Sequence, residues 1–212
     1  MSPHRHILLR LFPVCLIFAS TSFATIEQPN FLLFLADDLS YHDLGLSGNP
    51  DVKTPHLDHF ATQGTTFTHA YTSAPTCAPT RMSLYTGLHP VRHGGHPNHS
   101  AVYPGVRTLP HYLQNLGYAV GLMGKRHEKP PEQFPWQFLG GLHHDDGTKR
   151  DLDLTLASQF IDPVRDQPWC LIVASNQPHT PWKLGDASAY PPSELTVPPY
   201  LVDTPETRQG LS

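Results

Sequence analysis

Residues 30–38, NFLLFLADD, decide the fold of this chain because they join a continuous apolar run to a pair of carboxylates. The run from Asn30 to Ala36 shows no polar alternation, which is typical of a parallel strand covered on both faces. Asp37 and Asp38 follow at the carboxyl end of this strand, the end at which open α/β sheets bind ligands. The stretch therefore predicts a parallel sheet with a polar site at one edge.

Strand and helix signals continue to alternate after this first strand, in the order typical of an α/β domain. Helical spacing of apolar residues, together with proline near the start and glycine at the end, predicts helices over 54–64 and 109–117. Apolar spacing alone predicts a third helix over 151–161. Buried-type apolar runs predict strands over 118–123 and 169–175. Each predicted strand ends in polar residues, so we expect these residues to gather at the same edge of the sheet.

The segment after Ser175 is rich in proline and cannot form the interior of a regular sheet. We expect a long surface excursion here. A compact domain seldom finishes on a long irregular segment. We therefore expect the chain to continue in a longer parent protein.

Composition limits the classes of function that the motifs can support. The chain has 212 residues, 39% of them hydrophobic, which is enough for one globular domain with a sizeable core. A net charge of -4 and a pI near 6.4 provide no large positive field for phosphate backbones. We therefore expect no nucleic-acid partner.

The first 24 residues have the features of an export signal. A basic start precedes the apolar run from Leu11 to Ser20, and small residues around Ala24 suit cleavage after that position. The apolar run is shorter than the roughly 20 residues that span a bilayer, so we expect no stable membrane anchor. The sequence predicts a signal peptide at 1–24, a mature domain at 25–212, and a secreted or periplasmic protein.

Cleavage after Ala24 would remove Cys15 and leave Cys77 and Cys170 in the mature chain. In an oxidising compartment these cysteines could pair as a disulfide. Cys170 lies within a predicted buried strand, which favours a plain core thiol instead.

The segment 77–81, CAPTR, places a cysteine where a helix is expected to begin. Pro79 suits the first turn, and the helix could continue to Gly87. The dipole and the free amides at a helix start favour an anion, so Cys77 could be a thiolate nucleophile. A buried thiol without a chemical role is the alternative from the residues alone.

Four motifs, in the same order along the chain as in the family, resemble those of the sulfatase family. CAPTR with Thr86-Gly87 resembles its signature, and the run from Gly117-Tyr118 to 124–127, GKRH, resembles its second motif. Asp37-Asp38 match the family's metal pair, and 177–181, QPHTP, resembles its downstream histidine segment. The matches span nearly all of the mature chain. The resemblance implies a mostly parallel α/β sheet flanked by helices, the alkaline-phosphatase-like sulfatase fold, of which this chain would hold a truncated part.

Finer features resemble one branch of the family, the heparan N-sulfoglucosamine sulfohydrolases. These features are LADD at 35–38, GKRH at 124–127, VPPY at 197–200 and DTP at 203–205. The resemblance implies a sulfated glycan as substrate, either a sulfate ester or a sulfamate.

The resemblance also implies that Cys77 is a precursor. In sulfatases the signature cysteine is oxidised to formylglycine by a formylglycine-generating enzyme, and the hydrate of formylglycine attacks sulfur. The hydrate binds calcium together with Asp37 and Asp38, as hard oxygen donors that calcium prefers over a thiol. Capping of the following loop is the alternative role for the two carboxylates.

Four further residues are implied as catalytic. Arg81, one helical turn after Cys77, would orient the hydrate, whereas a solvated surface arginine is the alternative. Lys125 would hold a sulfate oxygen, and His127 would bind the formylglycine hydroxyl. Strand alternation would point these two to one side and Arg126 elsewhere. His179 would protonate the leaving atom, although a lone loop histidine is usually only solvated.

The other histidines are expected on the surface or in substrate loops, and no spacing among them matches a zinc site. They include His93, His96, His99, His143 and His144.

The chain also departs from the family pattern. Thr80 replaces the usual serine and keeps its hydroxyl, while the family's later metal ligands and second lysine have no match by Ser212. A truncated, inactive sulfatase-like protein that at most binds sulfated ligands is therefore the alternative to an enzyme. A related phosphatase or phosphodiesterase is disfavoured because those relatives differ more around Cys77.

Overall fold

The computed structural model describes residues 28–141, 152–182 and 184–212. The predicted export signal at 1–24 lies outside these residues. Within them, no helix is both long enough and apolar enough to cross a membrane.

The described chain contains a parallel sheet of four strands in the order β1-β4-β2-β3. These strands are β1 (Phe31–Asp37), β2 (Ala119–Gly124), β3 (Gln137–Phe138) and β4 (Trp169–Pro178). All the strand pairs are parallel, and Phe31 and Val120 both align with Cys170 on the central strand. The predicted α/β fold with a parallel sheet is confirmed.

Helices α1 to α6 span Pro55–Ala61, Cys77–Thr86, Pro90–His93, Leu109–Asn115, Thr155–Ile161 and Pro205–Leu211. Short 3-10 helices lie at Tyr41–Asp43, Gly45–Ser47, Pro131–Gln133, Asp162–Val164 and Ala187–Ala189. The helices predicted over 54–64, 109–117 and 151–161 correspond to α1, α4 and the shorter α5, with Asp151 outside the described residues.

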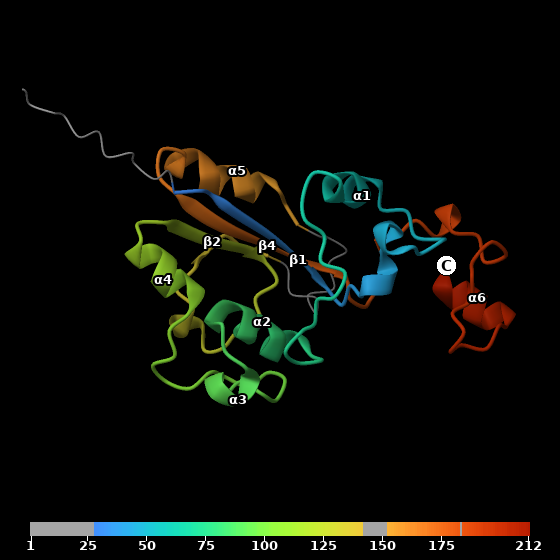
Figure 1. Ribbon diagram of the computed structural model, residues 1–212, viewed down its shortest axis with the longest axis horizontal. Helices are drawn as coiled ribbons and strands as arrows, with labels where there is room; N and C mark the ends of the chain where they lie inside the picture. The colour runs from blue at the N-terminus through green and yellow to red at the C-terminus, as the bar shows by residue number, and fades with distance from the viewer. Residues whose placement is uncertain (1–27, 142–151, 183) are drawn as a thin grey trace, which may run out of the picture.

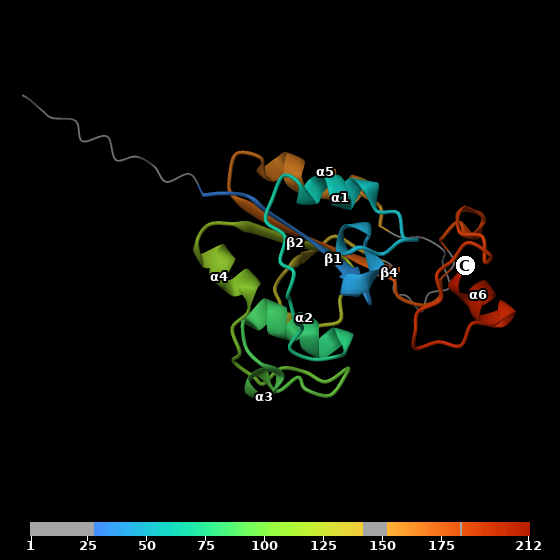
Figure 2. The same cartoon turned by 45° about the vertical axis from the view of Figure 1, so that its right-hand side comes forward.

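The helices form a layer on each side of the sheet (Figure 1). Helix α5 lies on one face, whereas α4, α2 and α3 lie on the other, and Figure 2 shows the same separation after rotation. Successive residues of β2 point to opposite faces, so Leu122 joins the core beneath α2 and α4 while Met123 joins the core beneath α5. The two layers bury both faces of β2 and β4, two of the strands that lead into the candidate site.

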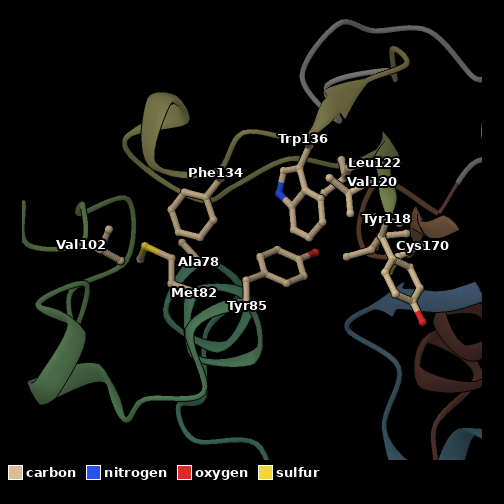
Figure 3. Close-up of a cluster of buried hydrophobic side chains, with 12 residues drawn as sticks. Ala78, Met82, Tyr85, Val102, Tyr118, Val120, Leu122, Phe134, Trp136 and Cys170 are labelled. Carbon is tan, nitrogen blue, oxygen red and sulfur yellow. The ribbon is translucent and has the colours of Figure 1, made fainter. Parts of the chain in front are cut away.

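The core beneath α2 is built on aromatic rings (Figure 3). The ring of Tyr85 meets Trp136 and Phe134 edge to face, with centroid distances of 5.3 and 6.3 Å. Such pairs add to the free energy gained from burial alone. Because Tyr85 belongs to α2, this packing fixes the helix that begins at Cys77.

Strand β1 corrects the expectation of a strand covered on both faces. Leu32 and Phe34 are 63% and 60% exposed, and within the described residues β1 pairs only with β4. Helix α1 shows the same departure, since Phe60 of its predicted apolar stripe is 71% exposed. An apolar run indicates which residues favour burial, but it does not indicate which other segment of the protein covers them.

Cys170 lies in the core, where burial raises the pKa of its thiol to about 11. Cys77 and Cys170 are both free cysteines. The disulfide alternative is therefore wrong for this structure, and the expectation of a core thiol at Cys170 is confirmed.

Strand β4 continues beyond its predicted end at Ser175 to Pro178, which pairs with Asp37 of β1, so the expectation that the sheet ends at Ser175 is wrong. The segment after β4 is mostly irregular, as predicted, but ends in the unpredicted helix α6. This helix lies apart from the two helical layers, beyond the carboxyl ends of the strands (Figure 1, Figure 2). The segment is anchored to an earlier loop, because the Thr196 N–H donates to Asp51 Oδ2 at 2.7 Å.

Candidate active site

The carboxyl ends of the central strands bring polar residues to one edge of the sheet, as the sequence predicts. Asp37 ends β1, and Lys125 follows β2 directly. The Lys125 ammonium forms a buried ion pair with Asp37, and the Lys125 N–H donates to the Ala174 carbonyl of β4 at 2.7 Å. Residues from three strands are therefore joined at this edge.

Gly124 makes this junction possible. Its φ of 87° lies in the left-handed region, and a Cβ at this position would stand 2.0 Å from the Ala174 carbonyl oxygen. A side chain cannot be accommodated at that distance from the backbone. The glycine of the GKRH segment thus lets β2 end close against β4 and deliver Lys125 to Asp37.

Asp37 lies between two cationic side chains. Arg81 Nη2 is 3.3 Å from Asp37 Oδ1, and Arg81 Nη1 donates to the Lys125 carbonyl at 3.3 Å. Asp37, Arg81 and Lys125 are all at most 5% exposed, so the alternative of a solvated surface arginine is wrong. Two cations around one carboxylate leave a local positive charge, which favours a bound anion.

Asp38 has a different environment from its neighbour. Its side chain is 60% exposed and its backbone has a φ of 62°, which is uncommon for a residue other than glycine. His179 Nε2 lies 3.6 Å from Asp38 Oδ2, which makes an ion pair only when the imidazole carries both protons. The following loop is capped by Asp43, which accepts from the Ser40 N–H at 2.9 Å.

Cys77 is the first residue of α2 and is half-buried, which does not match the alternative of a buried thiol. Its Sγ lies 3.8 Å from Asn98 Oδ1, which also accepts from the Ala78 N–H at 3.4 Å. The Thr80 hydroxyl donates to the Ala74 carbonyl at 2.7 Å and so steadies the first turn. The helix ends at Gly87 as predicted.

A cavity of about 260 Å³ lies in front of the start of α2. Its lining includes four of the predicted site residues: Asp37, Asp38, Cys77 and Arg81. The structure therefore brings the predicted nucleophile, both predicted metal ligands and the signature arginine around one hollow.

Lys125 and His127 line a second cavity of about 660 Å³, together with His99. His127 Nε2 lies 2.9 Å from His99 Nδ1, and the ring centroids are 4.7 Å apart. Burial, followed by the positive charge of Lys125, lowers the pKa of His127 to about 4. His127 is therefore neutral near pH 7 and carries a single ring proton.

The expected alternation of Lys125, Arg126 and His127 is only partly observed. Strand β2 ends at Gly124, so these residues lie beyond the regular strand on which the argument depended. Arg126 lines the same cavity as its neighbours, and its Nε donates to Glu128 Oε1 at 2.8 Å. The expectation that Arg126 points elsewhere is wrong.

The predicted residues thus fall into connected groups. The ion pair between Lys125 and Asp37 links the two cavities, while His179 reaches the first group through Asp38. His127 is linked to the start of α2 through Asn98 and His99. Asn98 was not named from the sequence, and His99 was expected only on the surface or in a substrate loop. The turn-forming residues of PNHS at 97–100 are the one sequence signal that could have indicated a tight loop here.

His93 corrects the expectation that the remaining histidines lie on the surface. It is fully buried, and its Nε2 lies 3.0 Å from the Ser83 hydroxyl of α2. His143 and His144 lie outside the described residues.

The donor types around the first cavity suit a hard cation in part. Asp37 and Asp38 offer carboxylate oxygens of the kind calcium prefers, whereas the Cys77 thiol is a soft donor. Asp37 Oδ1 already contacts Arg81 and Oδ2 already contacts Lys125, which leaves each oxygen one further acceptor position. Within residues 28–141, 152–182 and 184–212, no group of three or more His, Cys, Asp or Glu side chains is arranged to hold a metal ion.

The sequence of this chain is similar to a protein-family model and to several known proteins. A family model described as Sulfatase matches residues 29–197. The chain is 33% identical over 180 residues to an ulvan-active sulfatase from Formosa agariphila, covering 82% of this chain and 36% of that protein. It is 30% identical over 215 residues to N-sulphoglucosamine sulphohydrolase from Homo sapiens, covering 86% of this chain and 43% of that protein.

The fold also resembles a solved structure. The crystal structure of Ps i-CgsB superposes with a TM-score of 0.65 at 24% sequence identity, covering 86% of this chain and 51% of that chain. At this identity the likeness concerns the fold alone. The chain spans less than half the length of the two curated relatives described above.

Proposed function

Because this chain belongs to the sulfatase family, we propose that it contributes the nucleophile and the anion-binding residues of a sulfuric ester or sulfamate hydrolase. The observation that carries this proposal is the buried group of Asp37, Arg81 and Lys125 beside the start of α2. This group combines carboxylate oxygens for a cation with positive charge for sulfate, next to Cys77.

Cys77 is the proposed nucleophile after conversion to formylglycine, which replaces the soft thiol by oxygen donors. The position suits this role because residue 77 begins a ten-residue helix and is half-buried. The positive end of the helix dipole favours negative charge on the attacking oxygen. A formylglycine-generating enzyme is the partner that this conversion requires.

Arg81 and Lys125 are proposed to bind and orient the sulfate group. Both side chains are buried, where charge interactions are stronger than in water. The planar fork of Arg81 can hold two oxygens, whereas Lys125 supplies a point charge. Removing one such positioned group typically costs about a hundredfold or more in turnover.

Asp37 and Asp38 are proposed to hold a calcium ion together with residue 77. When bound, calcium polarises the sulfate and stabilises the negative charge of the nucleophile. Calcium takes about six to eight oxygens, so the proposal requires further ligands besides these residues.

His127 and His179 are proposed to handle protons. Neutral His127 can donate its single ring proton to an oxygen at residue 77. His179 Nδ1 lies 2.6 Å from the Thr180 carbonyl, which can only accept, so Nδ1 carries a proton. The other ring nitrogen, Nε2, faces Asp38. A second proton on Nε2 would make His179 the acid for the leaving oxygen or nitrogen.

A sulfated glycan is the proposed substrate, with sulfated glucosamine as its most specific form. The support is the identity shared with the human N-sulphoglucosamine sulphohydrolase, together with the branch features at 35–38 and 124–127. The proposed setting is secreted or periplasmic, from the export features of residues 1–24.

A silent protein that binds sulfated ligands is the second candidate. The observation that favours it is that the two oxygens of Asp37 contact Arg81 and Lys125, so a cation would share this carboxylate with two positive side chains. Such a protein would keep the positive charge that binds sulfate and lack turnover.

The test is sulfate release by the full-length protein, coexpressed with a formylglycine-generating enzyme and assayed with an aryl sulfate and N-sulfated glucosamine at millimolar calcium. The proposal expects release by the native protein and none by the Cys77→Ala variant. Equal release by both would exclude Cys77 as nucleophile. Binding of the sulfated sugar by calorimetry, without release from fully converted protein, would support the silent protein.

A further inference from the structure

Asn98 and His99 form a bridge that the proposed function does not use. Asn98 Oδ1 contacts Cys77 Sγ and the Ala78 N–H at 3.8 and 3.4 Å. Asn98 Nδ2 lies 3.4 Å from His99 Nε2, and His99 Nδ1 lies 2.9 Å from His127 Nε2. Polar contacts therefore run without a break from the start of α2 to His127.

We propose that Asn98 and His99 are positioning residues: Asn98 orients residue 77, and His99 determines which ring nitrogen of His127 carries the proton. The inference rests on the proposed function, in which residue 77 and His127 take part in one reaction. It extends that function to side chains that need not touch the substrate.

The direction of each hydrogen bond follows from the chemistry of its partners. Asn98 Oδ1 faces an S–H and an N–H donor, so the other end of the amide must be the NH₂ group. This NH₂ donates to His99 Nε2, which leaves the His99 proton on Nδ1. His99 Nδ1–H then donates to His127 Nε2, so the single proton of His127 resides on Nδ1.

His127 Nδ1 is a buried atom with no hydrogen-bond partner among the described residues. A buried N–H without a partner is costly and rare unless a functional group can use it. The bridge therefore keeps a proton donor at this atom and occupies the other ring nitrogen. Without His99, the proton could reside on either nitrogen and the ring could turn.

The backbone of His99 supports a functional role for its side chain. The loop closes as a turn in which the Ser100 N–H donates to the Pro97 carbonyl at 3.2 Å. His99 is the third residue of this turn and has a φ of 66°, a conformation that normally favours glycine. Imidazole is present here despite a strain of order 1 kcal/mol, as is common for residues at functional sites.

The loop is also anchored firmly enough to position other groups. Buried His93 joins Ser83 of α2 and accepts from the Gly95 N–H at 3.0 Å through Nδ1. A Cβ at Gly95 would lie 2.3 Å from Cε of Met82, so glycine allows the loop to approach α2 closely. Asn98 therefore extends from a segment that is fixed to the helix it caps.

The decisive variant is His99→Gly, because glycine fits the observed φ and removes only the imidazole. Nitrogen-15 chemical shifts of His127, recorded near pH 8.5 where ordinary imidazoles are neutral, report which ring nitrogen carries the proton. In the native protein we expect the His127 proton on Nδ1. In the variant we expect a mixture of the two neutral tautomers, with the proton on Nδ1 in some molecules and on Nε2 in others. Turnover should fall about tenfold, the usual lower bound for loss of a group that orients a functional histidine. His96→Gly, an exposed residue of the same loop, should change neither reading.

Asn98→Asp provides an independent test, because a carboxylate can only accept. At the same pH it should draw the His99 proton to Nε2, make His99 Nδ1 an acceptor, and move the His127 proton to Nε2. An unchanged His127 spectrum in both variants, or a native proton on Nε2, overturns the inference. If the native protein releases sulfate but the two variants do not change the His127 spectrum, the bridge is refuted and the proposed function stands. If the variants change the spectrum as expected but the native protein releases no sulfate, only the proposed function is refuted.

Discussion

The candidate site has a charged half and a neutral half that are held in different ways. Asp37, Arg81 and Lys125 are buried at the strand ends and bound to one another as ions. Asn98 and His99 are exposed and lie in a tight turn, and they connect by hydrogen bonds to His127, whose lowered pKa keeps it neutral.

This difference in burial and charge indicates which interactions stabilise each half. The charged half depends on burial, since each ion remains inside only while its partners are present. The neutral half depends on the direction of its hydrogen bonds. Replacing one donor group by an acceptor, as in Asn98→Asp, reverses that direction. Substitutions in the charged half should therefore affect folding and turnover together, whereas substitutions in the neutral half should affect turnover or titration with little loss of fold.

The largest expected effect is that of Asp37→Asn, with Asp38→Asn as its matched control. Removing the Asp37 charge leaves buried Arg81 and Lys125 without compensation, which should lower the free energy of unfolding by about 3–5 kcal/mol. Asp38 is exposed, so its variant should change the free energy by less than about 0.5 kcal/mol. Urea unfolding followed by circular dichroism measures both, and equal losses would refute the contrast between the neighbouring carboxylates.

The next effect concerns Lys125→Ala and Arg126→Ala. Lys125 supplies charge to the site, so its loss should lower turnover per folded molecule by about a hundredfold or more. Arg126 pairs instead with buried Glu128, so its loss should reduce stability and leave turnover within about tenfold of the native value. Turnover should be normalised to the folded fraction measured by circular dichroism. Similar losses of normalised turnover would show that Arg126 also acts on the substrate.

A smaller effect is expected from the pH dependence of stability. The pKa of His127 is lowered from 6.5 to about 4, so between these values the unfolded chain binds a proton that the folded chain does not. The contribution is fully present above pH 6.5 and is lost as the pH falls toward about 4. His127→Gln should therefore show a shallower loss of melting temperature over this range, while His96→Gln should follow the native curve. Parallel curves for native protein and His127→Gln would contradict the lowered pKa.

Local patterns in the sequence predicted much of the fold. Apolar spacing with a glycine stop predicted α4, and the apolar run after Gly117 predicted β2. The proline in the first turn and Gly87 likewise predicted the limits of α2. These signals are local because capping and periodicity involve neighbours within a turn or two.

Other features depended on contacts between distant segments. The exposure of Leu32 and Phe34 reflects which elements lie beside β1, which no local pattern contains. Strand β3 has only two residues, too few for a period to be recognised. Residue types at strand ends sufficed to predict the meeting of Asp37 and Lys125, since parallel strands share an edge.

The bridge through the 97–99 loop could not be predicted in the same way. Asn98 meets Cys77 across 21 residues and His99 meets His127 across 28 residues. Apart from Cys77, these residues lie outside strands and helices. Such contacts depend on the path of the loop, which buried His93 helps to determine.

The central claim is that residue 77 becomes the nucleophile of a sulfatase, and mass spectrometry of the tryptic peptide ending at Arg81 tests it most directly. The protein is produced in a host that converts a known sulfatase in parallel. We predict an aldehyde or its hydrate at position 77 in place of the thiol. Unmodified cysteine alone, in a host that has converted the reference sulfatase, would contradict the account.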